Sequence, residues 1–216
     1  MDEVKCPLKK LITSKKARAA YINERLEKLY PDVKCGLYFE GDPFRLLVMA
    51  RLSAQCTDKR VNMVSKELFK AYPDAKSMSE APIEKIEELV RTCGVYRMKA
   101  KNIKDMSRIL CEKYGGQVPS DMDELLALPG VGRKIANLIR GDVFGLPGIV
   151  ADTHCIRLSV RWGLCDKADP VAVERELVKL IEPDKQSNFC HCAVEFGRDV
   201  CSARSPKCDS CPLLNT

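Results

Sequence analysis

The feature that most constrains this chain is the stretch Leu-Pro-Gly-Val-Gly-Arg-Lys-Ile-Ala-Asn at residues 128–137. Gly130 and Gly132 permit backbone angles that other residues avoid, and they leave the turn without bulky side chains. The pattern therefore predicts two helices joined by a tight turn, with the first N–H groups of the second helix open to an anionic oxygen. The apolar residues that give the two helices their spacing are Leu125, Leu126, Leu128, Ile135, Leu138 and Ile139.

This predicted helix-hairpin-helix motif covers about residues 120–141. Ser120 can cap the first helix, and Gly141 can end the second. Such a motif binds a nucleic-acid phosphate without reading a base. A Gly-x-Gly pair alone is equally compatible with an ordinary helical hairpin, so the prediction depends on the whole string. The residues predicted to contact DNA here are Gly130, Val131, Gly132 and Arg133.

The string and a later aspartate resemble a known family. Lys134 lies at the mouth of the turn, and Asp152 follows in Ile-Val-Ala-Asp-Thr-His at residues 149–154. From about Ala17 onward the chain is similar to endonuclease III, a bifunctional DNA glycosylase and AP lyase of the helix-hairpin-helix-GPD superfamily. The resemblance implies two helical lobes with a DNA-binding groove between them. It also implies domains at 36–146 and at 1–35 plus 147–216, with an iron–sulfur loop at 201–216.

The sequence by itself also favours an all-α fold. No segment alternates apolar and polar residues as a half-buried strand does. Thr57 or Asp58 can cap a helix that continues through Phe69. Other helices are predicted at 17–29, 43–52, 83–92, 101–114, 153–162, 170–181 and 187–197, with a turn at 93–100.

Lys134 is the candidate nucleophile. A neutral amine can attack C1′ of a deoxynucleotide as the base leaves, and the resulting Schiff base permits β-elimination on the 3′ side. The helix N-terminus and the Arg133 cation both disfavour positive charge on this amine, which favours its reactive form. A lysine after a hairpin is also compatible with a plain phosphate contact. The resemblance favours the nucleophile, because family members that only excise bases carry a different residue here.

Asp152 has two compatible roles. An aspartate before Thr-His and a helical run is a good N-cap. The resemblance implies that its carboxylate also supports the charged sugar in the transition state and assists attack.

Further DNA contacts are implied by the resemblance. Gln55 of Leu-Ser-Ala-Gln and Val95 of Gly-Val-Tyr match residues that fill the gap left by an extruded base. A surface glutamine and a core valine are the alternatives. Asp58 is compatible with a place near the lesion or with a helix cap. The cations Arg97, Lys99 and Lys101 are predicted to face phosphates or plain solvent.

The chain has 12 cysteines, and without a secretory signal a metal site with free thiols is favoured over a disulfide framework. Cys201, Cys208 and Cys211 have the spacing C-x6-C-x2-C. The resemblance implies that they hold a [4Fe-4S] cluster, whose fourth cysteine falls one residue past Thr216. Three explanations stay open: the chain continues with that cysteine, a nearby residue replaces it, or the site is empty or holds zinc. The nearby candidates are Cys190, His191 and Cys192, and the remaining cysteines, Cys6 among them, are interpreted as buried or incidental thiols.

Charge and hydropathy limit the kinds of partner that this chain is expected to bind. The net charge of +6 suits a polyanion such as DNA, and no run approaches a membrane span or a signal peptide. Lys9, Lys10, Lys15 and Lys16 predict a basic N-terminal tail, either lying on DNA or simply solvated.

We therefore expect a monomeric, cytoplasmic, nucleoid-associated repair enzyme. It is expected to remove oxidised pyrimidines from duplex DNA and to nick abasic sites, with no diffusible cofactor and no Mg²⁺. The alternatives are a non-catalytic helix-hairpin-helix module that only docks DNA, and a monofunctional enzyme like the adenine glycosylases. The latter lack this lysine and carry an extra C-terminal domain.

Overall fold

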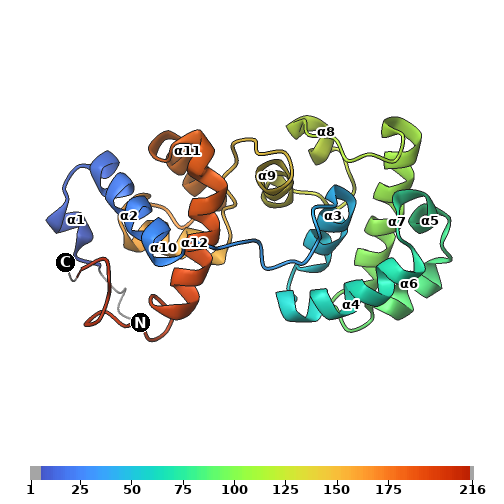
Figure 1. The fold of residues 1–216 in the computed structure, drawn as a ribbon, viewed down its shortest axis with the longest axis horizontal. Helices are drawn as coiled ribbons and strands as arrows, with labels where there is room; N and C mark the ends of the chain where they lie inside the picture. The colour runs from blue at the N-terminus through green and yellow to red at the C-terminus, as the bar shows by residue number, and fades with distance from the viewer. Residues whose placement is uncertain (1–5, 215–216) are drawn as a thin grey trace. The chain divides into compact units, whose positions relative to one another are not determined.

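The computed structural model describes residues 6–214 and is built from α-helices joined by loops, with one 3-10 turn (Figure 1). No strand occurs among those residues, which confirms the predicted all-α class. The chain divides into two compact units: the hairpin unit, residues 35–144, and the terminal unit, residues 1–34 and 145–216.

The hairpin unit has a core of helices that bury leucine, isoleucine, valine and methionine. Helix α9 packs against α3 and α8, while α7 lies against α5 and α6 (Figure 1). Its helices are α3 (Pro43–Leu52), α4 (Asp58–Ala71), α5 (Ala75–Glu80), α6 (Ile83–Val90), α7 (Tyr96–Tyr114), α8 (Met122–Leu126) and α9 (Arg133–Asp142).

The predicted start of α7 was wrong by five residues. The turn ends at Val95, whose backbone is left-handed (φ 57°, ψ 36°), and the helix begins at Tyr96. A valine rarely adopts this conformation, because its branched side chain crowds the backbone there. The prediction therefore extended the turn to residue 100, although Lys99 and Ala100 are buried on the helix.

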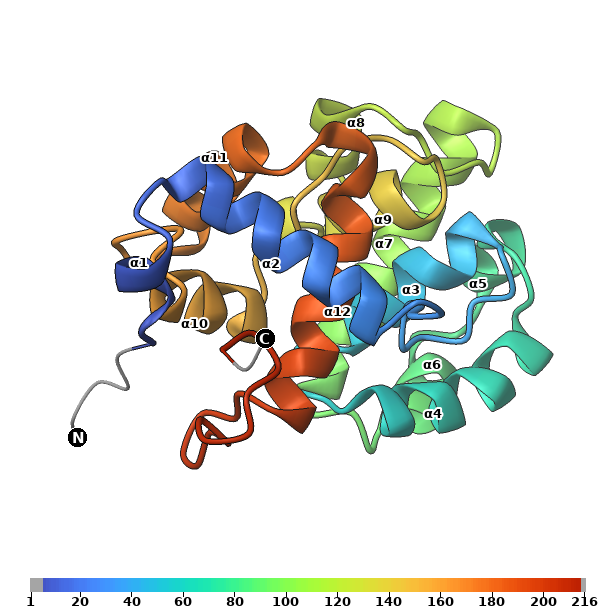
Figure 2. The same ribbon diagram turned by 60° about the vertical axis from the view of Figure 1, so that its left-hand side comes forward.

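The terminal unit joins the two ends of the chain around an aromatic centre. The ring of Trp162 packs against Phe189 and Phe196, with centroids 6.2 and 5.7 Å away. Figure 2 shows α2 crossing α12 within this unit. Its elements are α1 (Leu8–Leu11), α2 (Lys15–Leu29), α10 (Thr153–Arg161), α11 (Pro170–Leu180), η1 (Pro183–Lys185) and α12 (Gln186–Asp199).

The segment predicted as a basic tail is folded from residue 6 onward, although Lys9, Lys10 and Lys16 are exposed to solvent; residues 1–5 lie outside the described range. Leu8 on α1 is buried, and Lys9 and Lys15 lie near the carboxylate of Asp166 at 3.7 and 3.9 Å. The buried guanidinium of Arg18 donates to the carbonyls of Ile12 and of Gly163, the second at 2.6 Å. These contacts fold the segment onto its own unit.

Over residues 6–214, none of the helices has the length and apolar character that crossing a bilayer requires.

Candidate functional site

The first helix of the hairpin begins one residue later than predicted. Asp121 caps α8 because its carboxylate accepts from the N–H groups of Asp123 and Glu124 at 2.8 and 3.1 Å. Ser120 instead accepts, through its carbonyl, a hydrogen bond of 2.8 Å from Arg140 on α9. The predicted end at Gly141 was also wrong, since α9 includes Gly141 and runs to Asp142.

Gly130 is required by both its backbone and its surroundings. Its φ is +77°, and a Cβ here would lie 2.5 Å from Nε of Arg51 and 2.9 Å from Oδ1 of Asn102. Arg51 donates to that Asn102 oxygen through Nε and Nη2, at 3.1 and 2.9 Å. The turn therefore lies directly on a hydrogen-bonded pair supplied by α3 and α7. Sequence reasoning missed this pair, because no local signal links residues 51 and 102 to the turn.

Gly132 differs from the prediction. Its φ of −106° and ψ of 177° are accessible to most residue types, so the backbone angles at this position do not require a glycine. A Cβ there would meet nothing within 4 Å, and no side chain caps α9. An anion can therefore approach the first turn of α9 closely, where the helix dipole favours negative charge.

The other residues of the hairpin fall into an exposed group and a buried group. Gly132, Arg133 and Lys134 are exposed at the start of α9, while Ala136 and Ile139 are buried on its other side. Burial of that side fixes the helix, so the Lys134 amine projects from a supported element. Val131 is only 7% exposed and belongs to the core, so its main chain alone is available for contact.

Gln55 and Val95 lie on adjacent turns of the hairpin unit. Both have left-handed backbones, with φ of 56° and 57°, and both side chains are exposed, Val95 by 58%. A Cβ on Gly94 would lie 3.7 Å from the carbonyl oxygen of Gln55, so the two turns nearly touch. Left-handed backbone at a non-glycine residue is strained, and such strain tends to cluster at functional sites.

Buried contacts hold these turns together. Lys99 is 1% exposed, and its ammonium donates to the Leu52 carbonyl at 2.8 Å, just ahead of the Gln55 turn. The predicted phosphate contact of Lys99 is therefore wrong, because the side chain points into the unit. Burial, and then the neighbouring Cys56 thiol, raise the pKa of Cys93 to about 11. Cys93 thus stays a neutral thiol beside Cys56, between the two turns.

The remaining predicted contacts of this unit have local roles. Thr57 caps α4, since its hydroxyl accepts from the Arg60 N–H at 3.4 Å, and Asp58 is the first residue of the helix. Arg97 is exposed, with Nε 3.9 Å from a carboxylate oxygen of Glu87 and its guanidinium over the Tyr96 ring. Lys101 is exposed on α7.

Asp152 lies in the terminal unit and caps α10. Its carboxylate accepts from the N–H of Cys155 at 2.7 Å, and its own N–H donates to Val150 at 2.8 Å. The side chain is half-buried. Its carboxylate is therefore held at the start of a helix whose dipole stabilises the negative charge.

His154 has a structural role. Arg157 approaches the Nδ1 of His154 at 3.2 Å and donates to the carbonyls of Gly197 and Cys201, each at 3.1 Å. A Cβ on Gly197 would lie 2.5 Å from that Nδ1, so α12 passes closely over the ring. Burial lowers the pKa of His154, and Arg157 adds to the shift while Asp152 opposes it.

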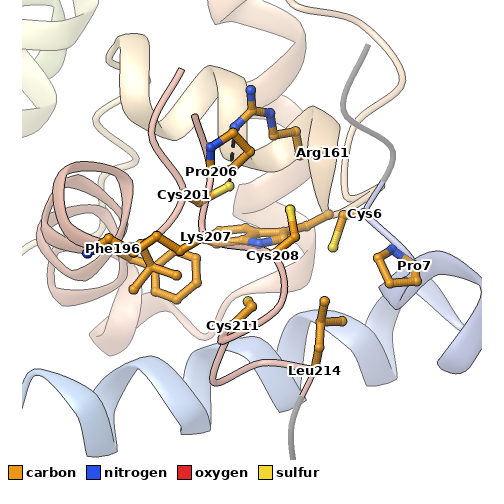
Figure 3. Close-up of a pocket in the computed structure, with 12 residues that line it drawn as sticks. Cys6, Pro7, Arg161, Phe196, Cys201, Pro206, Lys207, Cys208, Cys211 and Leu214 are labelled. Carbon is orange, nitrogen blue, oxygen red and sulfur yellow. Dashed lines mark hydrogen bonds between the residues drawn. The ribbon is translucent and has the colours of Figure 1, made fainter. Parts of the chain in front are cut away.

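The three predicted metal ligands face one pocket (Figure 3). Cys201, Cys208 and Cys211 line it, and Arg161 fastens the loop by donating to the Cys201 sulfur at 3.3 Å and to the Ser202 carbonyl at 2.7 Å. The pocket's empty volume, which includes space open to solvent, is about 360 Å³.

The donors fit an iron–sulfur cluster better than a zinc ion. The pocket presents thiols, apolar side chains and the two cations Arg161 and Lys207, and thiolates are the usual ligands of such clusters. Over residues 6–214, no three His, Cys, Asp or Glu side chains are grouped closely enough for a single metal ion. Cys190 accepts from the Val150 N–H at 3.2 Å, and neither it, His191 nor Cys192 lines the pocket.

The chain matches known proteins in two segments and along most of its length. Residues 48–183 match the HhH-GPD superfamily of base excision DNA repair proteins, and residues 201–215 match the iron-sulfur binding domain of endonuclease III. Endonuclease III of Synechocystis sp. is 46% identical over 205 residues, covering 94% of this chain and 93% of the relative. Endonuclease III of Bacillus subtilis is 42% identical over 193 residues, covering 89% and 88%.

A solved structure shows the same similarity. The structure of a trapped endonuclease III–DNA covalent intermediate has a TM-score of 0.87 and 44% identity, and the match covers 92% of this chain and 93% of that chain.

Proposed function

This chain belongs to the endonuclease III family of base-excision-repair DNA glycosylases with AP lyase activity, and we propose that it removes oxidised pyrimidines through a Schiff base on Lys134. The observation that carries the proposal is the exposed Lys134 in the first turn of an uncapped helix, on a turn anchored by Arg51 and Asn102. In the similar solved structure, endonuclease III is trapped in a covalent intermediate with DNA.

The proposed reaction begins at the Lys134 amine. The lone pair of this amine forms a bond to C1′ of the damaged nucleotide. At the same time the bond between C1′ and the base breaks, and the base leaves with the electron pair of that broken bond. The nitrogen loses a proton, the sugar ring opens, and an iminium ion forms. Loss of the C2′ proton then breaks the bond between C3′ and its oxygen, which leaves as the phosphate of the downstream strand. Water finally hydrolyses the imine and restores the amine.

Asp152 supplies the negative charge that this sequence needs. A carboxylate near C1′ stabilises the positive charge that develops as the base leaves, and it can accept the proton of the attacking amine. Its hydrogen bond from the Cys155 N–H fixes the carboxylate before DNA binds. Lys134 and Asp152 belong to different units, so the proposal requires DNA to contact both.

The base must leave the stack before attack, and Gln55 and Val95 are proposed to occupy the gap. Both side chains are exposed on adjacent turns. Buried contacts, such as the hydrogen bond from Lys99 to the Leu52 carbonyl, support these turns. Gly130, Gly132 and Arg133 are proposed to hold a phosphate through the main chain at the start of α9, which positions the duplex without reading sequence.

Cys201, Cys208 and Cys211 are proposed as thiolate ligands of the family's [4Fe-4S] cluster. When bound, the cluster supplies a rigid cross-link and a redox-active centre. Arg157 and Arg161 hold the same loop through its carbonyl groups.

Borohydride trapping tests the proposed chemistry. An enzyme that forms an imine becomes covalently attached to abasic duplex DNA when borohydride is present, and we expect such an adduct here. A docking module or a monofunctional glycosylase gives no adduct under the same conditions. Absence of the adduct, with DNA binding intact, contradicts the proposal.

A panel of duplexes tests the proposed substrates, each carrying one altered base such as thymine glycol or 8-oxoguanine. We expect release of oxidised pyrimidines and little release of purines. We also propose that the enzyme acts as a monomer. Measuring the molecular mass of the same preparation in solution, with and without DNA, tests this proposal. Its co-sedimentation with the nucleoid tests the proposed cytoplasmic, nucleoid-associated location.

A further inference from the structure

A pair of thiols lies beside the two turns that carry Gln55 and Val95. Cys56 follows Gln55 in the loop between α3 and α4, and Cys93 precedes Gly94 in the loop between α6 and α7. The two thiols share a side-chain hydrogen bond. Helix α4 packs against α6, and α3 packs against α7, so the helices on both sides of each loop support it (Figure 1). The reaction proposed above gives this pair no role.

Main-chain contacts bring the two cysteines together independently of their thiols. The N–H of each donates to the carbonyl three residues earlier, at 3.0 Å for Cys56 and 2.8 Å for Cys93. A Cβ on Gly94 would lie 3.7 Å from the carbonyl oxygen of Gln55, and that carbonyl belongs to the peptide group that joins Gln55 to Cys56. The two loops therefore approach each other at the position of the thiol pair.

The two thiols differ in their access to solvent. Cys56 is half-buried, whereas Cys93 is 0% exposed and belongs to the core of the hairpin unit. A reagent from solvent therefore reaches Cys56 first, and Cys93 is the neighbour that completes a reaction begun there. A second pair in hydrogen-bond contact, Cys155 and Cys190, is buried at both members, with 0% and 3% exposed, so it offers solvent no such entry point.

Two cations act on the buried thiol. Burial, followed by the Cys56 thiol, raises the pKa of Cys93 to about 11, while the charges of Lys99 and Arg60 oppose this shift. The thiolate is the nucleophilic form of cysteine, and nearby cations stabilise it. Cys93 is therefore protected from reagents in solvent, but these cations help its sulfur to attack a neighbouring sulfur that has become part of a disulfide.

We propose that Cys56 and Cys93 form a redox modification site, at which a reversible disulfide joins the two turns and slows base excision. The oxidant is a low-molecular-weight disulfide. The effect on excision rests on the proposed function, in which Gln55 and Val95 occupy the gap left by the extruded base.

The proposed oxidation takes two thiol–disulfide exchange steps. The Cys56 thiolate attacks one sulfur of the small disulfide, whose S–S bond breaks, and the first small thiolate leaves and takes up the proton that Cys56 lost. The Cys93 sulfur then attacks the Cys56 sulfur, the mixed disulfide breaks, and the second small thiolate leaves with the proton of Cys93. The two protein thiols are thereby oxidised by two electrons, and the small disulfide is reduced to two thiols.

The new bond changes the positions of both turns. The sulfurs of a disulfide lie closer together than those of two thiols in contact, so bond formation draws the turns toward each other. Gln55 and Val95 are one and two residues from the bond, and both already have left-handed backbones, with φ of 56° and 57°. Because a misplacement of about 1 Å can slow a reaction about 10²-fold, we expect excision to become at least about tenfold slower.

The test uses the full chain with its cluster, handled without oxygen and treated with 2-hydroxyethyl disulfide. Free thiols are then blocked, and disulfide-linked peptides are mapped by mass spectrometry. Single-turnover excision of thymine glycol from a duplex is measured before oxidation, after oxidation, and after reduction with dithiothreitol. We expect a disulfide between Cys56 and Cys93, excision slower by at least about tenfold, and full recovery after reduction.

Two variants assign the effect to this pair. Cys56→Ser has no thiol to start the reaction, and it should excise at the same rate before and after oxidation. Cys111→Ser removes another half-buried cysteine of the hairpin unit, and it should respond as wild type does. Equal slowing in Cys56→Ser would assign the effect to other thiols and overturn the proposal. A lack of the Cys56–Cys93 disulfide in oxidised wild type would overturn it as well.

The mapping separates this inference from the proposed function. A mapped Cys56–Cys93 disulfide with unchanged excision overturns the proposed control of activity and leaves the proposed function standing. If reduced wild type neither excises the damaged base nor is trapped on abasic DNA, the proposed function is wrong. The effect on excision then fails with it, although a mapped disulfide would still establish the modification site.

Discussion

At the scale of single residues, the sequence predicts best the roles that depend on near neighbours in the chain. The predicted N-cap at Asp152 is present, because a cap needs only the next helical turn. Lys99 and Val131 were expected at the DNA surface, yet both are buried. Which side of an element faces the core depends on contacts with other elements, such as the bond between Lys99 and the Leu52 carbonyl.

The substitution Asp152→Asn removes the negative charge of this side chain but keeps its ability to cap the helix. Asparagine caps a helix as well as aspartate does, so the thermal stability should change by about 0.5 kcal/mol or less. Base excision should fall by about 10²- to 10⁴-fold, because the charged group near the sugar is gone. Single-turnover assays and thermal melts measure the two effects; unchanged excision would remove Asp152 from the mechanism.

The half-buried His154 predicts how stability depends on pH. Burial lowers its pKa from the usual value of 6.5, with Asp152 and Glu195 opposing and Arg157 and Arg198 adding to the shift. Below pH 6.5 the unfolded chain therefore binds a proton that the folded chain does not, and the free energy of unfolding decreases as pH falls. Denaturant titrations from pH 7.5 to 5 should show a smaller decrease for His154→Gln; an equal decrease would assign the dependence to other groups.

At the scale of elements, sequence patterns located most helices but misplaced several ends. The 43–52 helix was predicted with its observed bounds, because Asp42 and Pro43 mark its start. The small helices α1 and α5 were missed, as each is too short to show a clear apolar period. The Arg51–Asn102 support beneath the hairpin was also missed, since it depends on how α3 and α7 pack.

The two hairpin glycines should respond differently to alanine. Gly130→Ala should destabilise the protein by about 1–3 kcal/mol, because its φ is positive and its new Cβ would meet Arg51 and Asn102. Gly132→Ala should cost about 1 kcal/mol or less, yet weaken DNA binding, because the methyl group enters the space where a phosphate approaches. Chemical denaturation and DNA titrations measure both variants; equal stability losses would contradict this view of the turn.

At the scale of the whole molecule, the composition indicates a globular protein whose positive charge suits a polyanion, but it does not show how the ends of the chain pack. Residues 1–34 belong with residues 145–216 through contacts such as Arg18 to Gly163 and Tyr21 to the Leu213 carbonyl. These contacts join positions far apart in sequence, so no periodic pattern reveals them. For the same reason no pattern showed that Cys6 lines the pocket of the C-terminal cysteines.

Peptide mapping of the reduced DNA adduct tests the central claim most directly. Wild type is trapped on abasic duplex with borohydride and digested, and the lysine that carries the sugar remnant is identified by mass spectrometry. Lys70→Ala, which removes an exposed lysine of the same unit, is the matched control for Lys134→Ala. We predict the remnant on Lys134 in wild type and in Lys70→Ala, and no adduct in Lys134→Ala. A remnant on another residue, or an undiminished adduct in Lys134→Ala, would contradict the account.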